Sequence, residues 1–190
     1  MDQASRLESS LMSSSVRLNC PVLYVDDSSD DHFLVQRAAI NTETPLQIQP
    51  FFSGEPAIAY LKHIPPFQDI AVYPSPYFLL CDYDLGTTKG HDLVAAVRSI
   101  ATCANLPIIM FSGADGDDSV AKSYLAGADH FLCKPLQTAR LEILVQTLYA
   151  CAMSTPTCFD ALSRLSEYEP CPATGGHPVY AASRLATSLR

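Results

Sequence analysis

Four groups of polar residues follow directly after short apolar runs of the chain. They are the pair Asp26-Asp27, then Asp82, Ser112 and Lys134. If the apolar runs are parallel strands, all four groups emerge at the carboxyl ends of those strands, where open α/β sheets bind ligands. Carboxylates, a hydroxyl and an ammonium group gathered at one such edge are suited to bind Mg²⁺ and a phosphoryl group.

The carboxylates are the expected metal ligands. Mg²⁺ prefers oxygen ligands, and proteins usually hold it with one or two carboxylates, waters and a phosphate. We expect Asp27 and Asp82 to bind the ion directly and Asp26 to bind it through a water. The backbone carbonyl of Asp84 would complete the ligands from the protein. Crowded carboxylates repel one another, which favours the binding of a divalent cation.

The remaining polar groups suit phosphoryl chemistry. An Asp carboxylate can act as a nucleophile that accepts a phosphoryl group, and phosphoryl transfer needs positioning and neutralisation of charge. Lys134 can contact a phosphoryl oxygen. The hydroxyl of Ser112 and the backbone N–H groups of Tyr83 and Gly113 can donate hydrogen bonds. Taken singly, each could be an ordinary turn or loop residue, but their shared position after apolar runs favours the functional interpretation.

The pattern of the chain predicts the elements that position these residues. Short apolar runs predict five strands, and amphipathic stretches predict five helices. The strands are expected at 20–25, 46–52, 77–81, 107–111 and 130–133, and the helices at 29–40, 53–63, 89–101, 117–126 and 138–153. Pro50 suggests that the second strand lies at an edge. The alternation of strands and helices predicts a parallel sheet covered on both faces.

The composition limits the kind of protein. With 190 residues, 48% of them hydrophobic, the chain can form one globular domain. The net charge of −8 disfavours binding to nucleic acid. No apolar run is long enough to span a membrane, and no secretory signal is recognisable. Seven cysteines without a C-x-x-C pair favour reduced thiols in a cytoplasmic protein over a zinc site or a disulfide framework.

The same patterns divide the chain into three parts. Residues 1–18 are rich in serine and are expected to form a flexible leader, residues 19–153 a single domain, and residues 154–190 a flexible tail. The tail contains several prolines and a Gly-Gly pair, and it lacks the apolar periodicity that a second domain would need.

Four motifs of the chain together resemble the receiver domain of two-component response regulators. They are YVDD at 24–27, LLCDYDLG at 79–86, PIIMFSG at 107–113 and AGADHFLCKP at 126–135. Gly90 and the spacings between Asp82, Ser112 and Lys134 also match. The resemblance covers about residues 20–152, and the combined set of motifs is highly specific.

This resemblance implies a flavodoxin-like, doubly wound α/β fold with a five-stranded parallel sheet of order 2-1-3-4-5 and five helices. It implies Mg²⁺ at Asp26, Asp27 and Asp82, and phosphorylation of Asp82 by a histidine kinase or phosphotransfer protein. Ser112 and Phe131 would form a switch pair that changes a protein-binding surface around the fourth helix, fifth strand and fifth helix. Such a protein is not an enzyme with a separate substrate, because it catalyses only its own phosphorylation and dephosphorylation.

The chain departs from the family pattern at several places. Gly86 stands where a proline is frequent, and Lys89 replaces a common acid. Asp84 places a further carboxylate near the path of an attacking water, and we hypothesise that it alters the lifetime of the phosphoryl group. The long loop at 64–76 and the lack of an output domain resemble the stand-alone regulators often paired with phytochrome-type kinases. Dimerisation through the last helix is a further expectation.

Two alternatives stay open at this point. The order Asp82-Tyr83-Asp84, then a hydroxyl and a lysine, also resembles the haloacid-dehalogenase-type phosphatases. In those enzymes the first Asp is the nucleophile and a second acidic pair follows the lysine, whereas here only Glu142 follows it before the tail. The second alternative is a receiver scaffold that works without phosphorylation, which the complete set of Asp, Ser and Lys disfavours. The sequence names neither the kinase nor the downstream target.

Overall fold

The computed structural model describes residues 20–113, 117–135 and 137–153. The predicted leader and tail lie outside the described residues. The elements are β1 (Val22–Val25), α2 (Ser29–Asn41), β2 (Ile48–Phe51), α3 (Gly54–Leu61), β3 (Phe78–Cys81), β4 (Asp84–Leu85), β5 (Thr88–Lys89), α4 (Gly90–Arg98), a 3₁₀ turn (Ala101–Cys103), β6 (Ile108–Ser112), α5 (Asp117–Ala126), β7 (His130–Cys133) and α6 (Thr138–Met153).

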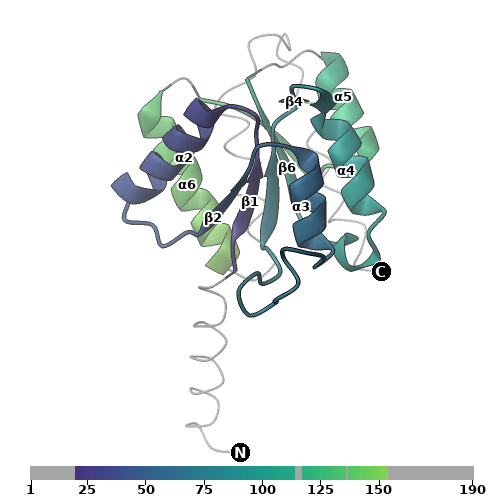
Figure 1. Cartoon of the computed structure of the whole chain (residues 1–190). Coiled ribbons are helices and arrows are strands. Elements are labelled where there is room, and N and C mark those ends of the chain that lie inside the picture. The colour runs from purple at the N-terminus through teal and green to yellow at the C-terminus, as the bar shows by residue number, and fades with distance from the viewer. Residues whose placement is uncertain (1–19, 114–116, 136, 154–190) are drawn as a thin grey trace, which may run out of the picture.

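Five strands form one parallel sheet in the order β2-β1-β3-β6-β7. Counted among themselves, these strands have the predicted order 2-1-3-4-5. Helices α2 and α6 cover one face of the sheet, and α3, α4 and α5 cover the other (Figure 1). The predicted doubly wound α/β fold is therefore confirmed. A separate antiparallel hairpin, β4-β5, follows β3.

The side chains of the central strands alternate between two apolar clusters, one on each face. Val22 and Tyr24 of β1 pack with α2 and α6, whereas Leu23 and Val25 belong to the cluster on the side of α3, α4 and α5. All four are at most 1% exposed. Because both faces of the sheet are covered, its central strands are apolar nearly throughout rather than alternating with polar residues.

Most predicted boundaries hold to within two residues, and the strand at 130–133 and the helices at 117–126 and 138–153 are confirmed as predicted. Strand β2 lies at the edge of the sheet, as Pro50 suggests. The helix predicted at 89–101 is one residue too long at its start and three residues too long at its end. It begins at Gly90, because Lys89 pairs with Asp84 in the hairpin, and it ends at Arg98. The sequence does not predict this hairpin, since two-residue strands carry no periodicity.

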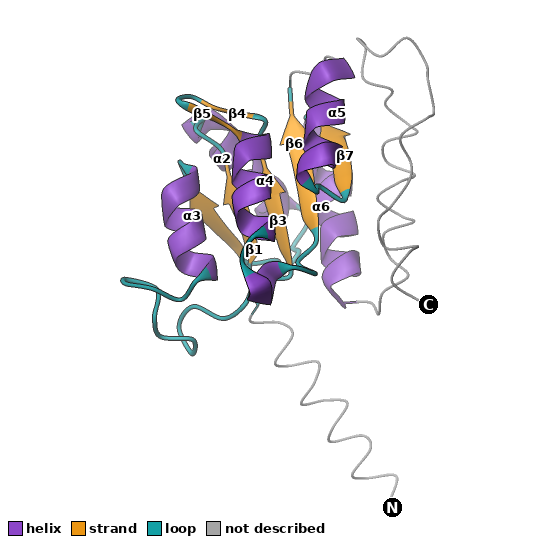
Figure 2. Ribbon diagram, turned by 90° about the vertical axis from the view of Figure 1, so that its right-hand side faces the viewer, coloured by secondary structure: helices purple, strands orange, loops and turns teal. Residues whose placement is uncertain are grey.

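The long loop between α3 and β3 is fixed by aromatic contacts. The ring of Phe67 lies 5.4 Å from that of Tyr60 and 5.1 Å from that of Tyr73. The hydroxyl of Tyr60 donates a hydrogen bond to the carbonyl of Pro74. Figure 2 shows this loop at the end of the sheet opposite the β4-β5 hairpin. The loop therefore lies far from the edge at which the candidate residues emerge.

Two predictions from composition can be compared with the structure. Within the described ranges, no helix is both long and apolar enough to cross a membrane. Cys20, Cys81, Cys103 and Cys151 are free thiols, as expected. Cys133 is disulfide-bonded, so the prediction of reduced thiols is wrong for this residue.

Candidate functional site

The predicted residues meet at the carboxyl edge of the sheet. Asp26 and Asp82 directly follow β1 and β3, Ser112 ends β6, and Lys134 directly follows β7. These four strands are adjacent and parallel, so their ends lie side by side. The backbone N–H of Lys134 also donates to the carbonyl of Ser112 at 2.9 Å. The fold thus places these groups as the sequence predicts.

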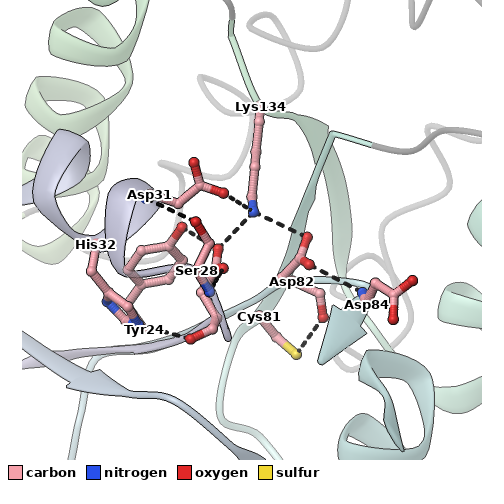
Figure 3. A network of polar contacts seen from close by, with 9 residues as sticks. Tyr24, Ser28, Asp31, His32, Cys81, Asp82, Asp84 and Lys134 are labelled. Atoms are coloured by element: carbon pink, nitrogen blue, oxygen red, sulfur yellow. Dashed lines mark hydrogen bonds and ion pairs between the residues drawn. The ribbon is translucent and has the colours of Figure 1, made fainter. Parts of the chain in front are cut away.

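The ammonium group of Lys134 is the centre of the polar network. Its Nζ lies 2.6 Å from Asp26 Oδ2, 2.7 Å from Asp31 Oδ2 and 3.3 Å from Asp82 Oδ1. Figure 3 shows the lysine side chain reaching down between Asp31 and Asp82. One ammonium therefore faces three carboxylates, and negative charge is in excess at this edge.

Burial and the surrounding charges shift the pKa values of Asp82 and Lys134. Burial raises the pKa of the Asp82 carboxyl, and the nearby positive charge of Lys134 offsets this only in part. Burial alone would lower the pKa of the Lys134 ammonium, but its hydrogen bonds to Asp26 and Asp31 raise it above its usual range. The lysine therefore stays charged, whereas the charged form of Asp82 is less favourable here than in water.

Asp26 is held rigidly by its neighbours. Its Oδ2 accepts a hydrogen bond of 2.5 Å from the hydroxyl of Tyr24, and its Oδ1 accepts one of 2.9 Å from the backbone N–H of Ser28. His32 Nε2 donates to the Asp26 carbonyl at 2.9 Å, since a carbonyl can only accept. Tyr24 and Asp26 are fully buried. Burial, followed by the charge of Asp26, raises the pKa of the Tyr24 hydroxyl, which therefore stays a donor.

The carboxylates of Asp26, Asp27 and Asp82 could together hold a metal ion. One oxygen of each lies within 4.8 Å of the others, and Asp27 is exposed while the other two are buried. Asp82 Oδ1 is buried and accepts no hydrogen bond within the described residues, despite its ion pair of 3.3 Å with Lys134. A buried carboxylate oxygen without a hydrogen bond, beside an exposed acid, fits a hard divalent cation that keeps some of its waters.

The β4-β5 hairpin shapes the other side of Asp82. The backbone N–H of Asp84 donates to Asp82 Oδ2 at 3.1 Å. The Asp84 carboxylate forms an ion pair of 2.9 Å with Lys89, and both side chains are about half exposed. The predicted metal contact through the backbone carbonyl of Asp84 stays a prediction.

Gly90 is required by close packing under Asp82. A Cβ at this position would lie 2.0 Å from the Asp82 carbonyl oxygen and 2.8 Å from Met110 Cε. Any side chain would therefore displace the backbone of Asp82. By contrast, a Cβ at Gly113 would meet no atom of the other described residues within 4 Å.

The expected switch residues lie on neighbouring strands. Ser112 of β6 pairs in register with Cys133, and Phe131 of β7 pairs with Met110, two residues before Ser112. Both Ser112 and Phe131 are buried, and Phe131 packs in the cluster on the side of α3, α4 and α5. This position would let a movement at the hydroxyl reach the ring behind it, but the switching role stays a prediction.

The sequence analysis did not connect four polar side chains with the site, namely Tyr24, Asp31, His32 and Lys89. Residues two apart on a strand point the same way, so Tyr24 could have been connected with Asp26. Asp31 stands three residues after the Ser28 cap, which accepts from its backbone N–H. That spacing places Asp31 in the first turn of α2, but its contact with Lys134 depends on how the helix packs. Lys89 stood out as a departure from the family pattern, but its contact with Asp84 could not be predicted, because the pair lies in the unpredicted hairpin.

The sequence model of the response regulator receiver domain matches residues 22–146. The chain belongs to this family. The match includes Asp26, Asp27, Asp82, Ser112 and Lys134. Receiver domains are signalling domains that generally lack enzymatic activity on other substrates. This membership agrees with the predicted resemblance and disfavours the phosphatase alternative.

Curated relatives share parts of the chain. The two-component response regulator ORR1 of Oryza sativa subsp. indica is 29% identical over 83 residues, which are 44% of this chain and 34% of the relative. The chain thus spans about a third of the length of that regulator. The chemotaxis protein CheY1 of Helicobacter pylori is 27% identical over 130 residues, which cover 66% of this chain and 97% of the relative.

Solved structures share the fold. The phosphorylated cyanobacterial phytochrome response regulator RcpA superposes with a TM-score of 0.64 at 23% identity, covering 73% of this chain and 96% of that one. The Mn²⁺-bound form of the response regulator Rcp1 gives a TM-score of 0.61 at 22% identity, covering 73% and 97%. At sequence identities of 22–23%, these structural similarities establish the five-stranded fold but say nothing about binding partners.

Proposed function

We propose that this receiver domain accepts a phosphoryl group on Asp82 in a Mg²⁺-dependent reaction and then changes a protein-binding surface. The observation that carries the proposal is the position of Asp82. Its buried Oδ1 accepts no hydrogen bond from the described residues and lies 3.3 Å from the Lys134 ammonium, and Asp82 belongs to the three-carboxylate cluster with Asp26 and Asp27.

The chemistry follows from the two oxygens of this carboxylate. The Asp84 N–H donates to Oδ2, so the two oxygens have different surroundings, and one would act as the nucleophile while the other would stay available to the metal. The nucleophilic oxygen attacks the phosphorus of the donor, an O–P bond forms, and the bond from phosphorus to the leaving group breaks with its electron pair. Lys134 then neutralises a phosphoryl oxygen, and Ser112 and the Gly113 N–H donate hydrogen bonds to the others. Mg²⁺ bound by Asp26, Asp27 and Asp82 would neutralise the charge that accumulates in this transfer.

The donor would be a histidine kinase or a phosphotransfer protein, as is general for the family. The readout would pass through Ser112 and Phe131 to the surface formed by α5, β7 and α6. Two large apolar side chains are exposed on the helices of this surface, Leu125 of α5 at 84% and Ile143 of α6 at 50%. Neither residue by itself marks an interface, but both would be accessible to a protein partner or to a second copy of the chain. Light scattering with and without a phosphoryl analogue would test the proposal of a homodimer. A monomer in both states would contradict that proposal.

A stand-alone regulator paired with a phytochrome-type kinase remains our proposal for the subclass. It is supported by the long 64–76 loop and by the fold shared with the phytochrome regulator RcpA. Reconstitution with a phytochrome-type kinase would test the pairing, and a chain that accepts phosphate only from kinases of other types would contradict it. The cytoplasmic location stays a prediction.

The direct test is intact-mass analysis after incubation with Mg²⁺ and acetyl phosphate. We expect one added phosphoryl group that is stable to acid, labile to base, and absent when EDTA is present. Asp82→Asn is the matched variant, because it keeps the shape of the side chain and removes the nucleophile. We expect no adduct on this variant.

Other outcomes would point elsewhere. An unmodified protein without phosphate release, even with a kinase as donor, would indicate a receiver scaffold that works without phosphorylation. Sustained hydrolysis of a generic phosphate ester such as p-nitrophenyl phosphate would revive the phosphatase alternative. An equal adduct on Asp82→Asn would place the acceptor on another residue.

A further inference from the structure

The Lys134 ammonium lies beside three carboxylates at unequal distances. It donates hydrogen bonds to Asp26 and Asp31 and forms a longer ion pair with Asp82. The separations from Asp26 and Asp31, 2.6 and 2.7 Å, are those of charge-assisted hydrogen bonds, whereas the 3.3 Å to Asp82 is longer. The lysine is thus bound more closely to the first turn of α2 and the end of β1 than to the proposed phosphoryl acceptor.

The two close partners of Lys134 differ in what a divalent cation would do to them. Asp26 belongs to the carboxylate cluster with Asp27 and Asp82, so a bound cation would share its negative charge. Asp31 is not part of that cluster. Its charge would stay available to Lys134 when the cation is bound. Asp31 is therefore the partner that continues to compete for the ammonium in the metal-loaded protein.

Asp31 is also held in place by its own backbone. It lies in the first turn of α2, and its N–H donates to Ser28 Oγ at 3.2 Å. Its side chain is 32% exposed, so the carboxylate lies at the rim of the site rather than deep within it. A phosphoryl group on Asp82 would add about two negative charges and three oxygen atoms that can accept hydrogen bonds. To contact them at hydrogen-bond distance, the ammonium would move toward Asp82 and lengthen its contacts with Asp26 and Asp31.

We propose that Asp31 is a positioning residue that holds Lys134 away from Asp82 in the unphosphorylated protein and competes with the phosphoryl group for its ammonium. This inference rests on the proposed function, since it assumes that Lys134 contacts a phosphoryl group on Asp82. Asp31 touches neither the metal cluster nor the reacting atoms. It sets how readily the lysine leaves its resting position.

The test is the affinity for beryllofluoride, a phosphoryl analogue, measured by ¹⁹F NMR titration in saturating Mg²⁺. Asp31→Asn keeps the backbone cap and the shape of the side chain but removes the charge. We expect it to bind beryllofluoride about five- to tenfold more tightly, the size of one hydrogen bond. Asp30→Asn is the matched control, because Asp30 is an exposed acid in the same helical turn that has no contact with Lys134 among the described residues. We expect its affinity to equal that of the wild type.

A second pair of variants separates positioning from simple repulsion of the anion. With Lys134→Met, the change Asp31→Asn should no longer affect the affinity for beryllofluoride, because there is no ammonium to release. An undiminished gain in the Lys134→Met background would overturn the inference, as would equal gains from Asp31→Asn and Asp30→Asn. A wild-type protein that binds no beryllofluoride and accepts no phosphate would instead refute the proposed function itself.

Discussion

Two networks of charged side chains lie at opposite ends of the sheet, and they differ in their balance of charge. At the carboxyl edge, the Lys134 ammonium faces three carboxylates. At the amino edge, Arg98 pairs with one carboxylate, Asp129, at 2.8 Å. Both cations are largely buried, with side chains 17% and 14% exposed. The number of opposing charges, rather than burial, therefore separates the two networks.

The Arg98 network is balanced. Its Nε donates to the carbonyl of Gly127 and one terminal nitrogen to that of Leu106, at 2.8 and 2.6 Å. The Asp129 Oδ2 that accepts from Arg98 also accepts from the backbone N–H of Ile108 at 2.8 Å. One positive and one negative charge thus join the end of α4 to the starts of β6 and β7. A balanced buried network of this kind fixes structure and has no need of a ligand.

The Lys134 network is unbalanced, and that imbalance is what a cation-binding site requires. Repulsion among the carboxylates costs stability while the site lacks a divalent cation, and binding of the cation relieves it. The comparison indicates that an excess of buried negative charge marks the functional end of this molecule. Removing a carboxylate charge should therefore lower stability at the amino edge of the sheet and raise it at the carboxyl edge.

The largest effect is expected from breaking the balanced network. Asp129→Asn leaves the Arg98 guanidinium buried without its counter-charge, which should lower the free energy of unfolding by about 3 kcal/mol. The measurement is urea denaturation followed by circular dichroism. Asp118→Asn is the control, because its ion pair with Lys122 is exposed and should contribute little. Equal losses of unfolding free energy for Asp129→Asn and Asp118→Asn would contradict the view that the buried Arg98 network fixes the structure.

The next effect is expected from filling the unbalanced site. Mg²⁺ at a hundred times its dissociation constant should stabilise the wild type by about 2.7 kcal/mol, since it binds the folded state alone. EDTA should reverse the gain. Asp27→Asn should weaken it, because Asp27 is the exposed member of the metal cluster. The melting temperature in the two buffers provides the measurement. A wild type that Mg²⁺ does not stabilise would show that the excess charge serves another purpose.

A smaller effect of opposite sign is expected from removing the charge of Asp82. Burial raises the pKa of this carboxyl, so the charged form is less favourable in the folded protein than in the unfolded chain. In EDTA, Asp82→Asn should therefore stabilise the protein, by roughly 1 kcal/mol. Urea denaturation would measure the gain, which should disappear in Mg²⁺. A loss of stability in EDTA would contradict our view of the site.

The smallest effect on stability, but a measurable one on chemistry, is expected at the hairpin. The ion pair of Lys89 and Asp84 is about half exposed, so Lys89→Ala should leave the unfolding midpoint unchanged. Releasing the Asp84 carboxylate toward an attacking water should shorten the phosphoryl lifetime by about threefold, as a weak general base would. The decay of the intact-mass adduct measures this lifetime. Adding Asp84→Ala should restore the longer lifetime, and no change in either variant would refute the hypothesis about Asp84.

The sequence was sufficient where a feature depends on periodicity and order along the chain. Apolar runs located all five strands of the sheet, and the residue after each run located Asp26, Asp82 and Lys134. These positions follow from the chain alone because parallel strands must end at the same edge. The fold and the main site could therefore be predicted together.

The sequence was insufficient where a contact depends on how elements pack. Asp31 meets Lys134 only because α2 is rotated over β1 in one particular way, and no spacing along the chain encodes that rotation. The hairpin that pairs Lys89 with Asp84 was missed because its strands contain two residues each. The partners of Arg98 come from two segments, 103–106 and 127–129, that are distant from each other in the sequence, so its importance becomes visible only in three dimensions.

The most direct test of the central claim is to locate the phosphoryl group. The protein would be incubated with acetyl phosphate, treated with borohydride, which reduces an aspartyl phosphate to homoserine, and mapped by tandem mass spectrometry. We predict that homoserine appears at Asp82 in Mg²⁺ and not in EDTA. Reduction at any other residue, or labelling of Asp82 that is equal in EDTA, would contradict the account.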